Sequence, residues 1–256
     1  MTTIVAQVIS SAEVRAVIHA SMLADDITIS RVSMDSLRNC SLSVDYVPVG
    51  SVEYVREFMR CCGISEPKLS PYPTVLQEYL HRSVRISTAF DIQRATTPLF
   101  IKPVSLKRFN GFVMDFKQPT NMYDAHDAIQ LKIVSGSISE KIWVSDVVSW
   151  QCEWRVYIDG NTVCGYGRYD PDGLDNAPMI DLTVVQSAID KMYAAGYTYP
   201  YTLDFGVLSS GETALVEAND FWAIGYYPST MSSTTYVNLL VKRWRAITQS
   251  AVHPSQ

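Results

Sequence analysis

Two acidic residues and one amide lie close together in the last quarter of the sequence. The stretch YTLDFGVLSSGETALVEAND has apolar runs on both sides of Ser210 and Gly211, which predicts a β-hairpin. A turn centred on that pair places Asp204 opposite Glu217. Because side chains two apart on a strand share a face, Asn219 joins Glu217. The pattern predicts three oxygen donors within about 5–7 Å of one another.

Such a group of oxygen donors favours a hard divalent cation. Two neighbouring carboxylates repel each other unless a positive charge lies near them. Mg²⁺ and Mn²⁺ prefer oxygen ligands, and Mg²⁺ usually binds one or two carboxylates together with substrate phosphates. The cation interpretation therefore also predicts a nucleotide. The alternative is a solvent-facing edge of the sheet on which the acids are simply hydrated.

Phosphates require cations, and two segments supply them. Lys102 lies in the apolar stretch PLFIKPVS, where a lysine is costly unless its ammonium group meets an anion or reaches solvent. A polar segment with Lys107 and Gly111 follows and is expected to fold over phosphates. In EWR, Glu153 and Arg155 share one strand face. They suit ribose hydroxyls and a phosphate respectively, and the alternative is a surface ion pair.

Local signals indicate the elements that position these residues. The stretch VDYVPVG predicts a strand, and SVEYVREFMRCCG predicts a helix capped by Ser51. The turn at Asp159 to Asn161 predicts a hairpin that includes EWR. A helix is expected from Thr183 to Ala195, with a capping box of Thr183 and Gln186. The stretch VNLLVKRWRAI predicts a second amphipathic helix, and strands and turns dominate from 96 to 145.

Composition and charge exclude several classes of protein. With 256 residues, 47% of them apolar, the chain can bury a substantial core. A net charge of −5 argues against general affinity for nucleic acids or anionic membranes. The sequence has neither a membrane-spanning run nor a signal peptide, so we expect a cytoplasmic protein. Cysteine and histidine spacing argues against a zinc site or disulfide framework, and no serine-hydrolase or P-loop motif is present.

The order of FIKP, KRFNG, EWR, LDFGVL and LVEAND resembles the ATP-grasp superfamily, and more closely its RimK-like branch of carboxylate–amine ligases. The resemblance is to a compact clade found largely in phage and bacterial genomes, and it covers residues 45–247. It implies an α+β fold in which two α/β lobes, mainly of antiparallel sheets, clasp ATP. The implied segments are an N-terminal lobe (1–95), a central ATP-grasp subdomain (96–148) and a C-terminal subdomain with the metal site (149–250).

The resemblance also implies a role for each candidate residue. The Mg²⁺ or Mn²⁺ ligands are Asp204, Glu217 and Asn219, and the residues near the phosphates or the acyl intermediate are Arg155 and Arg168. The nucleotide contacts are Lys102 and Lys107 for phosphates, Val144, Asp146 and Val147 for adenine, and Glu153 for ribose. The covering loop has a single glycine, and Asp146 replaces the commoner glutamate; both are departures from the pattern of the superfamily.

The activity implied is formation of an amide or peptide bond, with ATP converting a carboxylate to an acylphosphate and leaving as ADP. One alternative is an ATP-grasp phosphotransferase, and another is a module that binds nucleotide without turnover. ATP, a carboxylate and an amine are the expected partners. The sequence identifies neither acceptor, predicts no oligomeric state, and assigns no role to Asp220, whose parity points it away from the predicted metal site.

Overall fold

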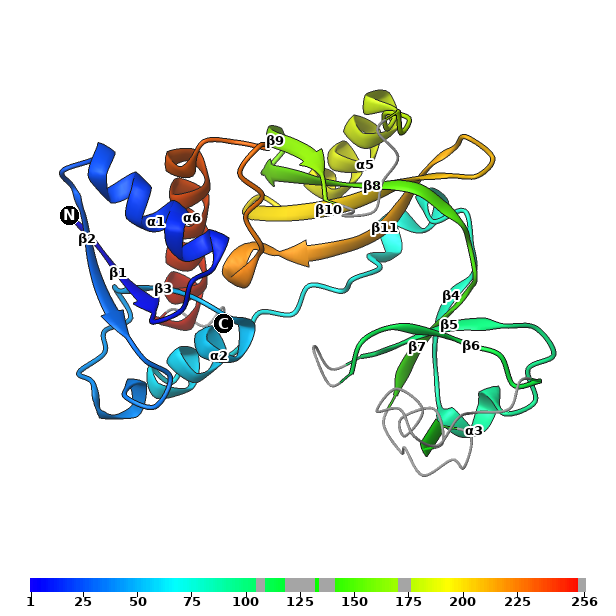
Figure 1. Cartoon of the computed structure of the whole chain (residues 1–256), viewed down its shortest axis with the longest axis horizontal. Coiled ribbons are helices and arrows are strands. Elements are labelled where there is room, and N and C mark those ends of the chain that lie inside the picture. Colours follow the sequence, from blue (N-terminus) through cyan, green and yellow to red (C-terminus); the bar gives the residue numbers. More distant parts are fainter. Residues whose placement is uncertain (105–108, 118–131, 134–140, 170–175, 253–256) are drawn as a thin grey trace. The chain divides into compact units, whose positions relative to one another are not determined.

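The structure is a computed structural model that describes residues 1–104, 109–117, 132–133, 141–169 and 176–252. It divides into two compact units, one of Met1–Tyr79 with Gln151–Gln256 and one of Leu80–Trp150 (Figure 1). Each unit is described by itself. Helices combine with mostly antiparallel sheets, which confirms the predicted α+β class. The predicted segment boundaries near residues 95 and 148 stay a prediction.

The first unit begins with a small parallel sheet. Its strands are β1 (Thr2–Gln7), β2 (Ile27–Val32) and β3 (Val47–Val49), in the order β2-β1-β3. Helix α1 (Ala12–Leu23) links β1 to β2, and α2 (Val52–Cys61) follows β3. The Ser51 hydroxyl accepts a hydrogen bond from the Tyr54 amide at 3.2 Å. The predicted helix and its cap are therefore confirmed.

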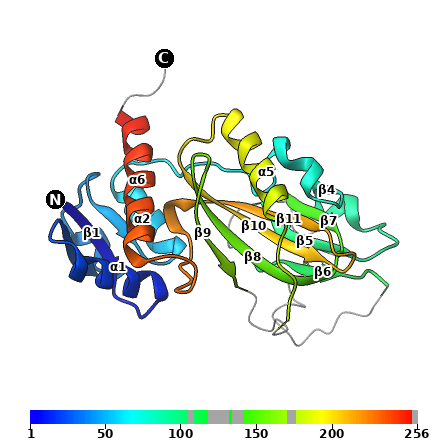
Figure 2. The ribbon, with the colours of Figure 1, turned by 90° about the horizontal axis from the view of Figure 1, so that it is seen from above.

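The same unit contains an antiparallel hairpin pair in one four-stranded sheet. Its strands are β8 (Trp150–Asp159), β9 (Thr162–Arg168), β10 (Pro200–Leu208) and β11 (Thr213–Asp220), in the order β11-β10-β8-β9. The predicted turn between β8 and β9 is confirmed, with Gly160 at φ 61°. A positive φ is readily adopted by glycine. Helix α5 lies along this sheet (Figure 2).

The expected start of α5 is wrong by one residue, and so is its cap. The helix runs from Leu182 to Ala194, and its N-cap is Asp181 rather than Thr183. The Asp181 carboxylate accepts bonds from the Thr183 amide at 2.8 Å and the Thr183 hydroxyl at 2.7 Å. Both residue types are good caps, and here the aspartate binds the first turn while the threonine lies within it.

One hydrophobic core joins the beginning and the end of the chain. Helix α6 (Ser233–Val252) packs against α1, and the two lie side by side in both views (Figures 1 and 2). The core includes residues of β1, β3, α2 and α6 together with the short helix η3 (Phe221–Ala223). Trp244 of α6 meets Phe58 of α2 edge to face at 5.6 Å, and its indole N–H donates to the Val44 carbonyl at 2.7 Å.

The second unit is a four-stranded antiparallel sheet with its own core. Its strands are β4 (Val84–Ser87), β5 (Leu99–Pro103), β6 (Phe112–Met114) and β7 (Ile142–Asp146), in the order β4-β7-β5-β6. The short helix α3 (Ala89–Ile92) contributes to that core, which also includes Ile101 and Val144. The remaining short helices, η1 (Leu37–Asn39) and η2 (Thr74–Tyr79), belong to the first unit. In the part of the chain that the structure describes, no helix is long and apolar enough to cross a membrane.

Candidate functional site

The three predicted oxygen donors converge on the β10–β11 hairpin. Asp204 pairs with Glu217 in the antiparallel ladder, as the sequence predicts. The Asn219 amide nitrogen donates to Asp204 Oδ2 at 3.2 Å and to Glu217 Oε1 at 3.1 Å. Between Asp204 and Phe205 the register shifts, so that Phe205 pairs with Leu215. This β-bulge offsets the half of the ladder nearer the turn and leaves the predicted pairing correct where the acids lie.

Asp204 is neutralised by an arginine on the neighbouring strand. Arg155 of β8 donates from Nε to Asp204 Oδ1 at 2.8 Å and from Nη2 to Asp204 Oδ2 at 2.7 Å. Asp204 is fully buried and Arg155 is 9% exposed. Burial raises the pKa of Asp204 to about 6, although the attraction and hydrogen bonds of Arg155 act in the opposite direction. The bidentate fork is the strongest geometry for this pair of side chains.

Two tyrosines and a glutamate surround the arginine. The Arg155 guanidinium carbon lies 5.3 Å from the ring centroid of Tyr169 and 5.5 Å from that of Tyr227, and the two rings are stacked at 5.6 Å. The Tyr169 hydroxyl donates to Glu153 Oε2 at 2.6 Å. Burial raises the pKa of Tyr169, and the Asp204 and Glu153 carboxylates raise it further. Tyr169 therefore remains a neutral donor that orients Glu153.

The first turn of α1 also reaches Arg155. Glu13 Oε1 accepts a hydrogen bond from the Tyr226 amide at 3.0 Å. A Cβ atom added to Gly225 would lie 3.5 Å from Arg155 Nη1 and 3.6 Å from Glu13 Oε1. Sequence reasoning missed Glu13, Tyr169 and Tyr227, because they approach Arg155 only after distant segments fold together. The one local signal was that Tyr169 directly follows the predicted Arg168.

The site residues fit a hard divalent cation in chemistry, and they would have to exchange partners to bind it. Glu217 and Asn219 are partly exposed, whereas both Asp204 oxygens are bonded to Arg155. Among the described residues, no three His, Cys, Asp or Glu side chains converge, so the Asn219 amide has to complete the donor set. The buried Thr202 hydroxyl, two residues before Asp204 on β10, has no hydrogen-bond partner within the described structure. A polar group left unpaired here indicates that the pocket around Asp204 is built for more than packing.

Asp220 has a structural role that the sequence did not reveal. Its carboxylate accepts bonds from Arg243 Nε at 2.8 Å and Nη2 at 2.6 Å, and both side chains are buried. The Arg243 guanidinium lies 3.7 Å from the ring centroid of Tyr199. Asp220 also caps η3 through the Trp222 amide. This ion pair ties the end of β11 to α6.

The second unit presents Lys102 on the sheet face opposite its core. Lys102 of β5 pairs directly with Trp143 of β7, and Phe100 lies on the same face because it is two residues away. All three side chains are partly exposed, whereas Ile101, which alternates with them, is buried. The face therefore combines a cation with aromatic surface, the combination that a nucleotide requires. A Cβ on Gly111 would lie 2.6 Å from Phe100 Cζ, so the chain passes close to this face.

The remaining sequence predictions fall in different places. Val144 is fully buried in the core of the second unit, which removes its side chain from any contact with adenine. Asp146 is exposed at the end of β7 and accepts a bond from the Ser83 amide at 2.9 Å, and Val147 is 44% exposed. Arg168 lies at the end of β9, opposite Trp154. Lys107 lies outside the described residues.

With this geometry established, the chain was compared with known proteins. It matches the model of an ATP-grasp domain family, the second family of its clade, over residues 79–238, more than half of its length. The chain belongs to this ATP-grasp family. The expected ATP-grasp fold is thereby confirmed. A comparison of the sequence with curated proteins found no match.

Solved structures of ATP-grasp ligases share the fold of this ATP-grasp chain over nearly their whole length. A RimK domain protein from Sphaerobacter thermophilus has a TM-score of 0.58 at 12% identity, with 96% of this chain and 99% of that chain covered. D-alanine–D-alanine ligase from Bacillus anthracis has a TM-score of 0.57 at 13% identity, covering 98% and 99%. The ATP-grasp ligase PsnB with a minimal precursor has a TM-score of 0.57 at 10% identity, covering 95% and 99%.

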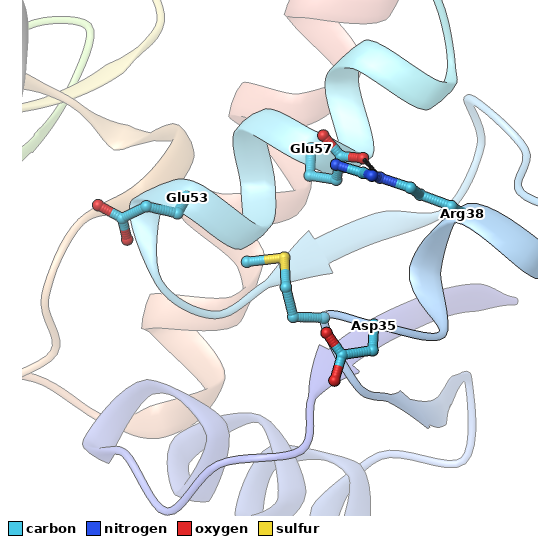
Figure 3. Close-up of a pocket in the computed structure, with 5 residues that line it drawn as sticks. Asp35, Arg38, Glu53 and Glu57 are labelled. Atoms are coloured by element: carbon cyan, nitrogen blue, oxygen red, sulfur yellow. Dashed lines mark hydrogen bonds and ion pairs between the residues drawn. The ribbon is translucent and has the colours of Figure 1, made fainter.

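A separate hollow lies beside α2 and includes none of the residues above. Figure 3 shows Arg38 and Glu57 facing each other across it, with Asp35 and Glu53 also on its wall. Its volume is about 400 Å³, and Met34 completes the lining. Hydrogen bonds from Arg60 and Arg38 lower the pKa of Glu57 to about 2. Because the chemistry of the family requires cations for phosphates, we assign the nucleotide to the residues around Asp204 and Lys102 rather than to this acidic hollow.

Proposed function

We propose that the chain is an ATP- and Mg²⁺-dependent carboxylate–amine ligase that acts through an acylphosphate and releases ADP and phosphate. The observation that supports this proposal most directly is the convergence of Asp204, Glu217 and Asn219 beside Arg155. An ATP-grasp chain that kept only the fold would have no need to bury a charged pair there, since burying ions is costly. Use of ATP also agrees with the cytoplasmic location expected from the sequence.

The names of the structural neighbours agree with a ligase. They include D-alanine–D-alanine ligase, and PsnB was solved with its minimal precursor, Mg and ADP. By analogy, Asp204, Glu217 and Asn219 would hold Mg²⁺ or Mn²⁺ in this chain. When bound, the cation would offset negative charge on the ATP phosphates.

The side chains of the site suit the two chemical steps. In the first step, a carboxylate oxygen of the substrate attacks the γ-phosphorus, and the bond to the ADP oxygen breaks. In the second, an amine nitrogen attacks the acyl carbon, phosphate leaves, and the amine loses a proton. Arg155 and Lys102 would offset charge on the transferred phosphoryl group, with Arg168 nearby, and positioning of this kind dominates such reactions. Glu153, oriented by Tyr169, would accept hydrogen bonds from ribose.

The Arg155–Asp204 pair gives this mechanism an ordered beginning. Asp204 has to release at least one oxygen from Arg155 before it can bind a cation, and a phosphate oxygen would replace it as a partner of Arg155. Both charges stay compensated during such an exchange, which avoids the cost of a bare buried charge. Lys107, Asp146 and Val147 keep the nucleotide contacts that the family resemblance implies.

The deciding experiment incubates the protein with Mg-ATP and pooled amino acids, peptides and cell extract, with mass spectrometry of the products. A condensed product together with ADP would support the ligase. AMP in place of ADP would contradict the acylphosphate route. A stable phosphorylated product would favour a phosphotransferase, and ATP binding without turnover across the panel would favour a binding module.

A further inference from the structure

We propose that a second hollow, beside α1, binds a carboxylate group carried on an apolar stem, and that this group is the recognition end of the substrate. The assignment to a substrate rests on the proposed function, whereas the preference for an anion rests on the lining of the hollow alone. We call this site the arginine hollow. It is lined by Val8, Ile9, Ser10, Val14, Arg15, Ile18 and Arg31.

The arginine hollow lies at the carboxyl ends of two parallel strands. Val8 directly follows β1, and Arg31 is the next to last residue of β2. Ligands of open α/β sheets bind at this end of the strands. The hollow has a volume of about 390 Å³, within the range of small-molecule pockets. Its position and size are those of a ligand site.

The lining selects an anion with an apolar stem. The charged residues in the lining are Arg15 and Arg31, both exposed, and the apolar wall comes from four aliphatic side chains. Arg31 Nη2 donates to the Ile9 carbonyl at 3.3 Å, and Arg15 Nη1 donates to the Ser10 hydroxyl at 3.4 Å. These two bonds hold the arginines at the rim. A guanidinium carries five N–H donors in a planar fork that matches a carboxylate.

The charge of the arginine hollow is a local property. The hollow beside α2, drawn in Figure 3, is lined by three acidic residues and one arginine. Both hollows border the same parallel sheet, so the sheet does not by itself attract anions. The preference for a carboxylate comes from Arg15 and Arg31.

The first turn of α1 connects the arginine hollow to the Arg155 site. Glu13 bonds to Tyr226 next to Arg155, and Arg15 lines the hollow. With 3.6 residues per turn, two residues are about 200° apart around a helix. Glu13 and Arg15 therefore point to nearly opposite sides of α1. A ligand that uses both places has to pass the N-terminal end of the helix, so the carboxylate in the hollow is a distal group and not the reacting one.

The test measures binding to the full chain without nucleotide. The ¹⁵N-labelled protein is titrated with 4-methylpentanoate and with its neutral amide, and in a second arm with an acetylated Leu-Leu-Glu-Leu peptide amide and its glutamine counterpart. The double variant Arg15→Gln/Arg31→Gln removes both guanidiniums. Arg245→Gln is the matched control, because Arg245 is also exposed in the first unit and makes one 3.4 Å bond to a hydroxyl, that of Thr2.

We expect the carboxylates, and not their neutral counterparts, to shift the amide signals of Ser10, Arg15 and Arg31. Each guanidinium contributes about tenfold to affinity and the pair about 100-fold, as expected for charged hydrogen bonds. The double variant should lose this binding, and Arg245→Gln should keep it. Binding of the free acid identifies a small-molecule source, and binding of only the peptide identifies a peptide source.

Two results would overturn the proposal: equal shifts from the acids and their amides, or undiminished affinity in the double variant. Mg-ATP hydrolysis without acceptor is measured in parallel and should not change in the double variant. If the protein hydrolyses no ATP but still binds carboxylates through Arg15 and Arg31, the ligase proposal fails and the arginine hollow stands. If hydrolysis occurs and the carboxylate preference is missing, the reverse holds.

Discussion

Replacing Arg155 with methionine should destabilise the protein in a pH-dependent way. The change keeps most of the side-chain volume and removes the partner of a fully buried carboxylate. An uncompensated buried charge costs about 3–5 kcal/mol. At pH 8 we therefore expect the free energy of unfolding of Arg155→Met to fall by about that amount relative to the wild type.

The pKa of Asp204 sets the pH window of this effect. Burial raises that pKa from 3.8 to about 6, and one pKa unit corresponds to about 1.4 kcal/mol. Because the folded state binds the proton more tightly than the unfolded state, ionised Asp204 costs the wild type about 3 kcal/mol above pH 6 and nothing below about pH 4. Removing Arg155 raises the folded pKa further. At pH 5 Asp204 is largely protonated in both proteins, so the loss should shrink to about 1–2 kcal/mol.

Urea denaturation followed by tryptophan fluorescence at pH 8 and pH 5 measures both values. The control is a double-mutant cycle with Asp204→Asn, in which Arg155→Met/Asp204→Asn should be more stable at pH 8 than the sum of the single effects predicts, by at least about 2 kcal/mol. An equal loss at both pH values, or additive single effects, would refute the assignment of a compensated buried charge at Asp204.

Three further predictions test other parts of the structure. Glu217→Ala should abolish Mg-dependent ATP turnover in a phosphate-release assay, and turnover at the wild-type rate would remove the metal assignment. Lys102→Ala should weaken ATP binding about tenfold in calorimetry, the loss expected for a charged phosphate contact; unchanged affinity would count against that contact. Gly165→Ala should lower the free energy of unfolding in urea by about 1–3 kcal/mol through overpacking, since its Cβ would lie 2.5 Å from the Thr230 carbonyl oxygen. A stability equal to that of the wild type would contradict this close approach.

Local patterns were enough to predict the hairpin that holds the acids. Alternation and a turn signal placed Asp204 opposite Glu217 because both are short-range properties, and the bulge beyond Asp204 did not disturb that pair. The same patterns failed for the cap of α5, where Asp181 and Thr183 are both suitable residue types and only the folded backbone decides.

The electrostatic partner of Asp204 was beyond the reach of the sequence. The two residues that form the pair are 49 positions apart, and nothing local distinguishes an arginine bound to a phosphate from one bound to a buried carboxylate. Tyr227 and Glu13 come from still more distant segments. The sequence therefore predicted which residue types meet in the site and left their resting partners undetermined.

The shared core of the first unit imposes an order on folding during synthesis. The strands of the parallel sheet leave the ribosome early, yet α1 packs against α6, which is translated roughly 200 residues later. The second unit, residues 80–150, has its own core and can fold during that interval. Until α6 emerges, the apolar faces of α1 and α2 have no helix to cover them. Nascent chains stalled before residue 233 should therefore bind hydrophobic-surface chaperones through their N-terminal segment and release them once α6 is complete.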